Sequence, residues 1–551
     1  IPLHFGTQVP YNVEVEPPPP GLQTEFETLL STEVLQFLSD LCCRFQPEVD
    51  KVLKMRILRK VQLDLSEELP GFTEDTAHIR NDPSWRVSPV PVRLQCRHVD
   101  IGDLSPCDTQ RLTQALKSTA QGIQVDFDDG NCPTYYNQIK GIYNVYKVVH
   151  NQFHDAPPIS QAPVLMLRPR AWNMVEHNML VKGREVPGPL FDFGLLMFHN
   201  AKLLLENQSG PFFYLSKVES YLEARLWNQI FLWTEDRLGL PVGSIKATVL
   251  IECVLATFEM EEILYELREH SAGLNCGIWD YSASFVNKFG HRAEFLLPDR
   301  SKYVNMEKRF LRSYMELLVQ TCHRRGAPAT GGMAALLLPT HTDSAVYTTV
   351  LNTVTRLKLL EIRAGVDGFM VYDMNLIEPM QKLFQLHCTG PNQLHQLRHD
   401  VSVTSEDLLT VPAVTFTVIV LCLLLCGSGR GHFFFKGQVE DSATAEISRS
   451  QVWQWIRHRV KLEDDGRTVV TRGFIRSLTQ GMMGDLRAAA CCQTQRDEAR
   501  LTTAMSMFLE LVQKSDFPEF LTTYLYLDHT FLSAQGQHEE TGTERSHRAR
   551  L

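Results

Sequence analysis

The stretch Arg268–Tyr281, which reads REHSAGLNCGIWDY, says more about the fold than any other part of the chain. It lies downstream of a short apolar run, Val249–Ile251, that is followed at once by an acid, Glu252. A second acid, Asp280, comes near the end of the stretch itself. In a parallel barrel the carboxyl ends of neighbouring strands meet at one face, where carboxylates can serve as oxygen ligands for a hard cation. The two acids therefore predict a barrel with a cation site at that face.

Short β-prone runs alternate with amphipathic helical stretches from about residue 90 to about residue 450. The runs expected to form strands are Val164–Leu167, Phe212–Leu215, Ala247–Ile251, Ala334–Leu338 and Gly368–Tyr372. A repeated strand-then-helix pattern predicts an α/β fold with a parallel sheet, and a (β/α)8 TIM barrel fits a segment of this length.

Helical segments flank the predicted barrel. Val34, Leu38, Leu41 and Phe45 recur at helical spacing, and the chain after Ile447 has a helical pattern. The predicted organisation is an extended lead-in over 1–21, an N-terminal helical module over 22–87, the barrel over 88–437, a C-terminal helical domain over 438–533 and a polar tail over 534–551.

The composition is that of a soluble globular protein. Of 551 residues, 44% are hydrophobic and 21% are charged, and the 64 acids outnumber the 54 bases to give a net charge of −10. A nucleic-acid partner would require a basic surface and is not expected. The thirteen cysteines show no CxxC spacing, which favours free thiols in a reducing compartment.

An uncharged segment, Leu408–Gly429, stands out from the rest of the chain, and Ala413–Cys426 within it is apolar except for two threonines. A membrane helix needs about 18 or more apolar residues, and Pro412 interrupts this run. A buried strand with its neighbour is therefore preferred, and membrane attachment is not expected.

Four further segments place charged residues in apolar, strand-like surroundings, where a buried charge needs a partner or a function. They are LRPRAWNMVEH (Leu167–His177), GPFFYLSKVESYLEARLWN (Gly210–Asn228), HRRGAPATGGMAA (His323–Ala335) and EDSATAEISR (Glu440–Arg449). Together with REHSAGLNCGIWDY, these segments resemble the motifs of malate synthases of the shorter, peroxisomal or glyoxysomal type, in the family order. The resemblance runs from about residue 30 to the end of the sequence.

The resemblance implies a (β/α)8 barrel with a helical N-terminal module and a C-terminal helical domain. It also implies an acyltransferase of the glyoxylate cycle that condenses glyoxylate with acetyl-CoA and hydrolyses the thioester to malate and CoA. Asp441 matches the catalytic Asp, the base that takes a proton from the acetyl methyl group. Arg168 matches the catalytic Arg that stabilises the enolate. Glu252 and Asp280 would hold Mg²⁺, which polarises the glyoxylate carbonyl.

The resemblance assigns supporting roles as well. Asp128, in VDFDDG, stands where the family has the Glu that helps to orient the catalytic Arg in ADFEDS. Gly331, Gly332 and Met333 are expected to add close backbone contacts.

Each functional reading has a structural alternative. Asp441 can cap the helix that follows it, because Asp is a favoured N-cap residue. Arg168 can pair with Glu176 or with an acidic loop, and Glu252 and Asp280 can be salt-bridge partners. For Lys217, Glu219 and Arg225, at a predicted strand-to-helix junction, a structural ion-pair network and a functional role stay equally open.

The chain departs from the family at several positions. The usual Arg before Trp279 is Ile278, and Ser282-Ala283 replace an aromatic ending. The family's DGTWVAHP is DGFMVYDM at Asp367–Met374, which predicts an altered acyl-CoA pocket. Residues 413–436 keep little of the family pattern, which indicates either a mis-predicted exon or intron in the sequence or real divergence.

Two other functions stay open at this point: a malyl-CoA-type barrel lyase and a catalytically impaired CoA-binding homologue. The final residues, Ala549-Arg550-Leu551, are a variant of the Ser-Lys-Leu peroxisomal address. They predict recognition by the peroxisomal import receptor and a peroxisomal location, or a cytoplasmic one if the signal is not read.

Overall fold

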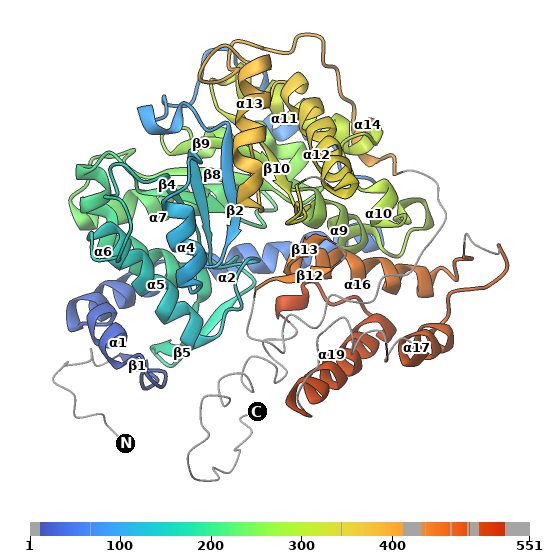
Figure 1. The fold of residues 1–551 in the computed structure, drawn as a ribbon, viewed down its shortest axis with the longest axis horizontal. Coiled ribbons are helices and arrows are strands. Elements are labelled where there is room, and N and C mark those ends of the chain that lie inside the picture. The colour runs from blue at the N-terminus through green and yellow to red at the C-terminus, as the bar shows by residue number, and fades with distance from the viewer. Residues whose placement is uncertain are drawn as a thin grey trace.

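The computed structural model describes residues 12–66, 68–342, 344–411, 431–435, 437–462, 466–481, 484 and 495–523. Eight parallel strands form a closed barrel in the order β10-β11-β2-β3-β4-β7-β8-β9 (Figure 1). The strands are β2 (Val99–Leu104), β3 (Gly122–Asp126), β4 (Val164–Arg168), β7 (Phe212–Leu215), β8 (Lys246–Ile251), β9 (Ser271–Cys276), β10 (Ala329–Ala334) and β11 (Gly368–Val371). The predicted TIM barrel is confirmed.

Helices connect the barrel strands and cover the outside of the barrel (Figure 1). They are α4 (Thr109–Leu116), α5 (Tyr135–Val149), α6 (Gly188–Glu206), α7 (Tyr221–Leu238), α8 (Met260–Glu266), α9 (Ile278–Phe289), α11 (Arg309–Arg324), α12 (Ala345–Ala364) and α13 (Ile377–His387). Because helices cover the sheet outside and side chains fill it inside, nearly every strand residue is buried.

Four of the five predicted strands lie where the sequence placed them, to within one residue at either end. The strand predicted at Ala334–Leu338 is wrong, because the barrel strand β10 ends where this run begins. Glycines weaken the strand pattern of β10, but Gly332 is required because a Cβ there would lie 2.9 Å from the backbone oxygen of Cys276 on β9. The apolar residues after β10 leave the barrel, where Leu337 donates its amide to the carbonyl of Gly437 at 2.8 Å.

The stretch that decides the fold forms strand β9 and the first turn of α9. Within β9, Gly273 has a φ of +98°, and a Cβ there would overlap the backbone of Pro328, so only glycine fits. The strand ends at Cys276, Gly277 is the N-cap of α9, and Asp280 lies in the first helical turn. This geometry brings Asp280 to the carboxyl face of the barrel, as predicted.

An N-terminal unit packs against one side of the barrel. The long helix α2 (Thr32–Leu65) follows α1 (Gln23–Leu29) and contacts α6, α7 and α9. Its residues Val34, Leu38, Leu41 and Phe45 are buried, so the predicted helical spacing is confirmed. A three-stranded sheet of β1 (Val13–Val15), β5 (Val175–Val181) and β6 (Arg184–Pro187) and a short helix α3 (Ala77–Asn81) complete this region.

The C-terminal part is helical, with α16 (Ser442–Arg457), α17 (Arg472–Gly481) and α19 (Gln495–Gln513). In Figure 1, α17 and α19 lie at the lower right, and α16 lies between them and the barrel, where it packs against α9. Other short elements are α10 (Arg300–Tyr303), α14 (Ser405–Leu409), β12 (Phe433–Phe435) and β13 (Gln438–Glu440). The domain boundaries given above stay predictions.

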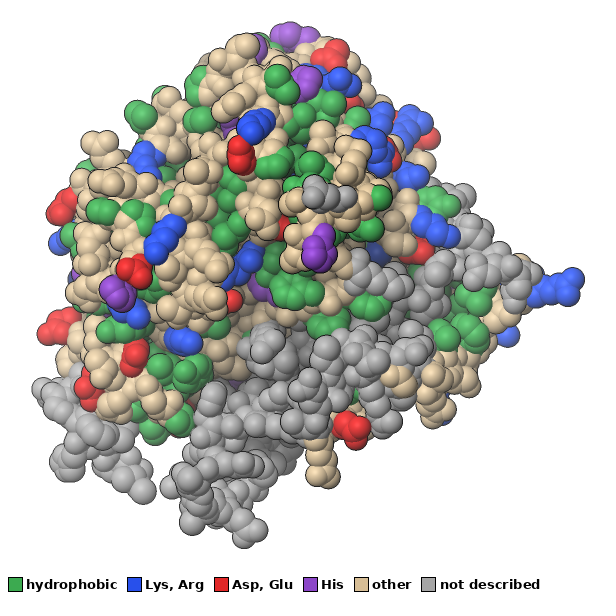
Figure 2. All heavy atoms as spheres, in the orientation of Figure 1, with side chains coloured by type: hydrophobic (Ala, Val, Ile, Leu, Met, Phe, Trp, Pro, Cys, Tyr) green, Lys and Arg blue, Asp and Glu red, His purple; other side chains and the backbone are tan. Residues whose placement is uncertain are grey.

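The apolar run Ala413–Cys426 and the tail that ends in Ala549-Arg550-Leu551 lie outside the described residues. Within the described ranges, no helix has both the length and the apolar character needed to cross a membrane. On the face shown in Figure 2, acidic and basic side chains of the described residues are interspersed. A group of buried charges lies at the carboxyl face of the barrel.

Candidate active site

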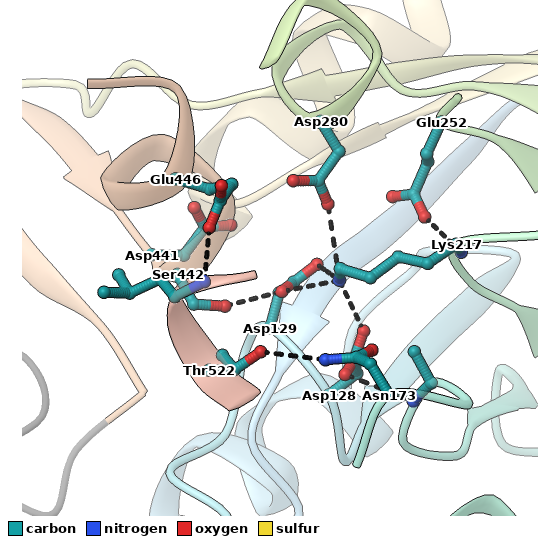
Figure 3. A network of polar contacts seen from close by, with 12 residues as sticks. Asp128, Asp129, Asn173, Lys217, Glu252, Asp280, Asp441, Ser442, Glu446 and Thr522 are labelled. Atoms are coloured by element: carbon teal, nitrogen blue, oxygen red, sulfur yellow. Dashed lines mark hydrogen bonds and ion pairs between the residues drawn. The ribbon is translucent and has the colours of Figure 1, made fainter. Parts of the chain in front are cut away.

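Charged side chains from five barrel strands and from the C-terminal part converge at the carboxyl face of the barrel (Figure 3). All of them are buried, with exposed fractions of 3–7%. They are Asp128 and Asp129 after β3, Arg168 at the end of β4, Lys217 after β7, Glu252 after β8, Asp280 after β9 and Asp441 before α16. The four central residues predicted from the sequence thus lie in one cluster.

Three carboxylates of this cluster form a group that can hold a metal ion. Asp129, Glu252 and Asp280 each offer one oxygen, and these oxygens lie within 4.8 Å of one another. The sequence predicted Glu252 and Asp280 as ligands but not Asp129. A signal for Asp129 exists in the sequence, since two consecutive acids follow β3, but the resemblance assigns a role only to the first of them, Asp128.

The surroundings of Asp280 favour the binding of a cation. Neither of its carboxylate oxygens accepts a hydrogen bond from the described residues, although the side chain is only 4% exposed. Its nearest charged partner is the ammonium of Lys217, at 3.3 Å. Burial, and then the nearby charges of Asp129 and Glu252, raise the pKa of Asp280 well above its ordinary value. A divalent cation would relieve this unfavourable environment.

Arg168 is held by carboxylates on several sides. Its guanidinium lies 2.5 Å from Asp129, 3.2 Å from Asp126, 3.3 Å from Asp128 and 3.4 Å from Glu252. The predicted pairing with an acidic loop is therefore confirmed. The Nε atom of Arg168 is buried with no acceptor among the described residues. It is a fixed donor that can act on a bound substrate.

One predicted structural pairing is wrong, and Arg225 forms a structural ion pair away from the cluster. Glu176 pairs with Arg170 at 2.9 Å, so its proposed pairing with Arg168 is wrong. Arg225 pairs with Glu266 at 2.8 Å in a partly exposed position, and the structure does not bring it into the acidic cluster.

Lys217 lies at the centre of the cluster. Its Nζ is 2.7 Å from Asp128, 2.8 Å from Asp129 and 3.3 Å from Asp280, and its amide donates to Oε2 of Glu252 at 2.8 Å. Burial disfavours the charged amine, but these carboxylates outweigh it and raise the pKa of Lys217. The residue has a φ of +52°, a conformation that costs about 1–3 kcal/mol for a residue other than glycine. Such strain is common at functional sites.

Asp441 both caps a helix and faces the acidic cluster. It caps α16, because its Oδ1 accepts from the amide of Thr444 at 2.9 Å. It also faces the cluster: burial, and then the charge of Asp129, raise its pKa, and its own charge raises the pKa of the neighbouring Asp103. Next to it, Ser442 donates to Oδ1 of Asp129 at 2.5 Å, which ties the start of α16 to the acidic group.

The residues expected to have supporting roles lie in two parts of the barrel. Asp128 lies within the cluster but is closer to Lys217 than to Arg168, as expected for a side chain shorter than Glu. Gly331 and Gly332 lie on β10 beside a buried Lys358–Glu361 ion pair, in which the Nζ of Lys358 donates to the carbonyl of Gly332 at 2.6 Å. Met333, on the same strand, lies against Gly102. These three residues have packing contacts, and their functional role stays a prediction.

The C-terminal segment covers this site. A cavity of about 20 Å³ beside the acidic group is lined by Lys217, Glu252, Asp280, Glu446, Glu519 and Phe520, among others. The amide of Leu521 donates to Oε2 of Glu446 at 2.7 Å, and Nδ2 of Asn173 donates to Thr523 at 2.8 Å. Figure 3 shows Asn173, Thr522 and Glu446 around the acidic cluster. The cover shields the cluster from bulk water.

Two aromatic side chains in or next to the segments that depart from the family pattern are packed against arginines. The guanidinium of Arg111 stacks 3.9 Å above the ring of Tyr372 and donates to its carbonyl at 2.5 Å. Arg300 lies 5.3 Å above the ring of Trp279 and pairs with Glu440, the neighbour of Asp441, at 2.7 Å. Tyr372, in the altered segment 367–374, is thus packed against Arg111 of α4.

Comparisons with known proteins agree with this geometry. The family model described as malate synthase, TIM barrel domain, matches residues 164–411, and the model described as malate synthase, C-terminal, matches residues 425–528. A malate synthase of Myxococcus xanthus is 40% identical over 91% of this chain and 94% of its own length. One from Dictyostelium discoideum is 38% identical over 91% of this chain and 94% of its own length. One from Arabidopsis thaliana is 38% identical over 83% of this chain and 85% of its own length. The matched ranges include five residues of the cluster: Arg168, Lys217, Glu252, Asp280 and Asp441.

Proposed function

The chain belongs to the malate synthase family, and from this premise we propose that Arg168, Asp441 and the acidic group carry the reaction of that family. The reaction condenses acetyl-CoA with glyoxylate and hydrolyses the thioester, which releases malate and CoA. The observation that supports this assignment best is the single buried cluster at the carboxyl face of the barrel, where active sites of this fold lie.

Asp441 is proposed as the base. The methyl group of acetyl-CoA is a weak carbon acid, so its proton must pass to a well-placed carboxylate. Burial raises the pKa of Asp441 and makes it a better proton acceptor than a solvated carboxylate. Its capping bond to Thr444 uses Oδ1 and fixes the direction of the side chain.

Arg168 is proposed to stabilise the negative charge that develops on substrate oxygens. Removal of the proton leaves an enolate, whose carbon attacks the aldehyde carbon of glyoxylate to form the new C–C bond. The aldehyde oxygen becomes an alkoxide and takes up a proton. A guanidinium held rigidly by Asp126 and Asp129 needs little reorganisation to stabilise both oxygens.

The acidic group fits Mg²⁺. Asp129, Glu252 and Asp280 supply only carboxylate oxygens, the ligands that this ion prefers, and the oxygens of Asp280 accept no hydrogen bond from the described residues. When bound, Mg²⁺ acts as a Lewis acid on the glyoxylate carbonyl. We propose all three residues as ligands, with Asp129 added to the pair predicted from the sequence.

The second half of the reaction needs controlled access of water. Water must cleave the thioester C–S bond only after the C–C bond has formed, since earlier hydrolysis would waste acetyl-CoA. Leu521 and Thr523 hold the C-terminal part over the cluster through Glu446 and Asn173. We propose that this cover limits water during condensation.

The two alternative functions find no support in the comparisons, since the relatives named above are malate synthases. Product analysis tests the proposal directly. Incubation with acetyl-CoA, glyoxylate and Mg²⁺ is expected to give free malate and free CoA. An intact malyl thioester would indicate a lyase, and binding of acetyl-CoA without turnover would indicate an impaired homologue.

A peroxisomal location is proposed as well. Relatives from Candida tropicalis and Cucumis sativus, 34% and 38% identical, carry the word glyoxysomal in their names. Microscopy of a fluorescent fusion that keeps residues 549–551 at its end tests this. Peroxisomal puncta that disappear when Ala549-Arg550-Leu551 are removed support it, and diffuse fluorescence in both cases contradicts it.

A further inference from the structure

A buried arginine of the N-terminal helix α2 reaches the turn that carries Lys217. Arg56 is only 5% exposed, and its Nη2 donates to the carbonyl of Lys217 at 2.6 Å. Its Nε and Nη2 also donate to the two carboxylate oxygens of Glu223, both at 2.7 Å. This two-point pairing fixes the plane of the guanidinium and therefore the position of the donor to Lys217.

The backbone of the turn at Lys217 is strained, and hydrogen bonds from neighbouring residues hold it in place. Its positive φ is unfavourable, so the turn relaxes unless its neighbours hold it. Two hydrogen bonds hold it from opposite ends of the residue: the amide donates to Oε2 of Glu252, and the carbonyl accepts from Arg56. Because Glu252 is a proposed metal ligand, the backbone geometry of Lys217 sets the direction in which this carboxylate points.

The charges around Arg56 form a closed network of their own. Glu219 lies 2.7 Å from the ammonium of Lys288 on α9 and 4.0 Å from Arg56. With Glu223, two acids and two bases are buried together between α2, the β7–α7 turn and α9. This network joins the N-terminal helix to the turn beneath the acidic group.

We propose that Arg56 is a positioning residue that sets the Mg²⁺ affinity of the site by holding the backbone of Lys217 and, through it, the carboxylate of Glu252. The inference rests on the proposed function, since it assumes that Glu252 is a metal ligand. It extends the site beyond the barrel to a helix of the N-terminal unit.

The competing explanation is that Arg56 only attaches α2 to the barrel, and Arg325 provides a matched control for it. Arg325 is also buried, at 2% exposed, and its Nε donates to Glu261 at 2.6 Å. It also donates to main-chain carbonyls of the N-terminal region, those of Asp82 at 2.6 Å and Arg80 at 2.9 Å. It precedes β10 and therefore lies at the opposite, amino end of the barrel strands.

The experiment compares Arg56→Gln and Arg325→Gln in the full chain. Calorimetric titration of the substrate-free protein with Mg²⁺ gives the dissociation constant, and circular dichroism checks the fold. We expect Arg56→Gln to weaken Mg²⁺ binding by about 10–100-fold, the range typical for a residue that supports a metal ligand. In kinetics, the KM for Mg²⁺ should rise while kcat at saturating Mg²⁺ changes little. Arg325→Gln should lower the melting temperature and leave Mg²⁺ binding within about twofold of wild type.

An unchanged dissociation constant in a folded Arg56→Gln variant overturns the inference, and so does an equal loss in Arg325→Gln. If Arg56→Gln does not fold, Arg56→Lys decides, because an ammonium cannot keep both the Glu223 pair and the bond to the Lys217 carbonyl in the same geometry. Weaker Mg²⁺ binding by Arg56→Lys than by Arg325→Lys supports the inference, and equal binding overturns it. Wild-type protein that binds no Mg²⁺ contradicts the proposed metal site itself and removes the basis of the inference.

Discussion

The ammonium nitrogen of Lys217 lies 2.8 Å from Oδ2 of Asp129, so a buried lysine is directly paired with a proposed metal ligand. The same nitrogen is 2.7 Å from Asp128 and 3.3 Å from Asp280. Three acids that would repel one another are thus held around one positive charge. Two of these acids, Asp129 and Asp280, are proposed metal ligands. The proposed metal site is therefore already formed in the folded chain, where Lys217 stabilises it.

Replacement of Lys217 by Met should destabilise the metal-free protein by about 3–5 kcal/mol, because it leaves buried carboxylates without their counter-charge. Urea unfolding without Mg²⁺ measures this loss. Lys382→Met is the control, since Lys382 forms an exposed pair with Glu378 and should unfold like wild type. Equal stability of the two variants would contradict the role given to Lys217.

Asp129→Asn should weaken Mg²⁺ binding by at least about tenfold, because it removes the charge of one proposed ligand. Titration of the substrate-free variant with Mg²⁺ gives the value. Asp192→Asn serves as the control, since Asp192 is equally buried but is paired with Arg170. If Asp129→Asn binds Mg²⁺ like wild type while Glu252→Gln does not, Asp129 is only an ion-pair partner.

Asp441→Asn separates the base from the helix cap. Asn is as good an N-cap as Asp, so the melting temperature should stay close to that of wild type. Loss of the base should lower kcat by about 10²–10⁴-fold. Asp441→Ala should lose the same activity and also about 1 kcal/mol of stability. A fully active Asp441→Asn enzyme would leave only the capping role.

Glu259 should make stability depend on pH. Burial, with a smaller contribution from Glu262, raises the pKa of the Glu259 carboxyl to about 7. A carboxyl group whose pKa is higher in the folded state binds protons more readily there, so its contribution to stability is present at low pH and is lost as the pH rises from about 4.5 to 7. Glu259→Gln removes this pH-dependent contribution to stability and keeps an acceptor for the amide of Tyr221. Urea unfolding measures the free energy of unfolding of both proteins at pH 5 and pH 8. Between pH 5 and pH 8, wild type should lose stability relative to Glu259→Gln. If the difference in stability between the two proteins is the same at both pH values, the raised pKa of Glu259 is contradicted.

Much of the fold could be predicted because the relevant signals are local. A buried strand followed by an acid, as at Glu252, recurs along the chain and indicates the carboxyl face of a barrel. The sequence pattern misplaces β10 because its glycines serve a tertiary need, the close approach of the Cys276 backbone to Gly332, which leaves no local pattern. The apolar run after it looked more like a strand than the strand itself.

The site was predicted in part for the same reason. Arg168, Glu252, Asp280 and Asp441 each stand in a recognisable segment, and the fold brings them together. The importance of Lys217 depends on contacts with residues about 90 positions before it and 63 after it in the chain, which its own segment does not reveal. Sequence patterns therefore found the residues with chemical roles more readily than those that hold them in place.

The measurement that tests the central claim most directly is the release of free CoA from acetyl-CoA by the purified full chain, with thiol detection and chromatographic identification of malate. CoA and malate should appear in equal amounts, only when glyoxylate and Mg²⁺ are both present, and Asp441→Asn should lower the rate of release of both by about 10²–10⁴-fold. A folded wild-type protein that releases no CoA under these conditions, or that releases it at the same rate without glyoxylate, would contradict the claim.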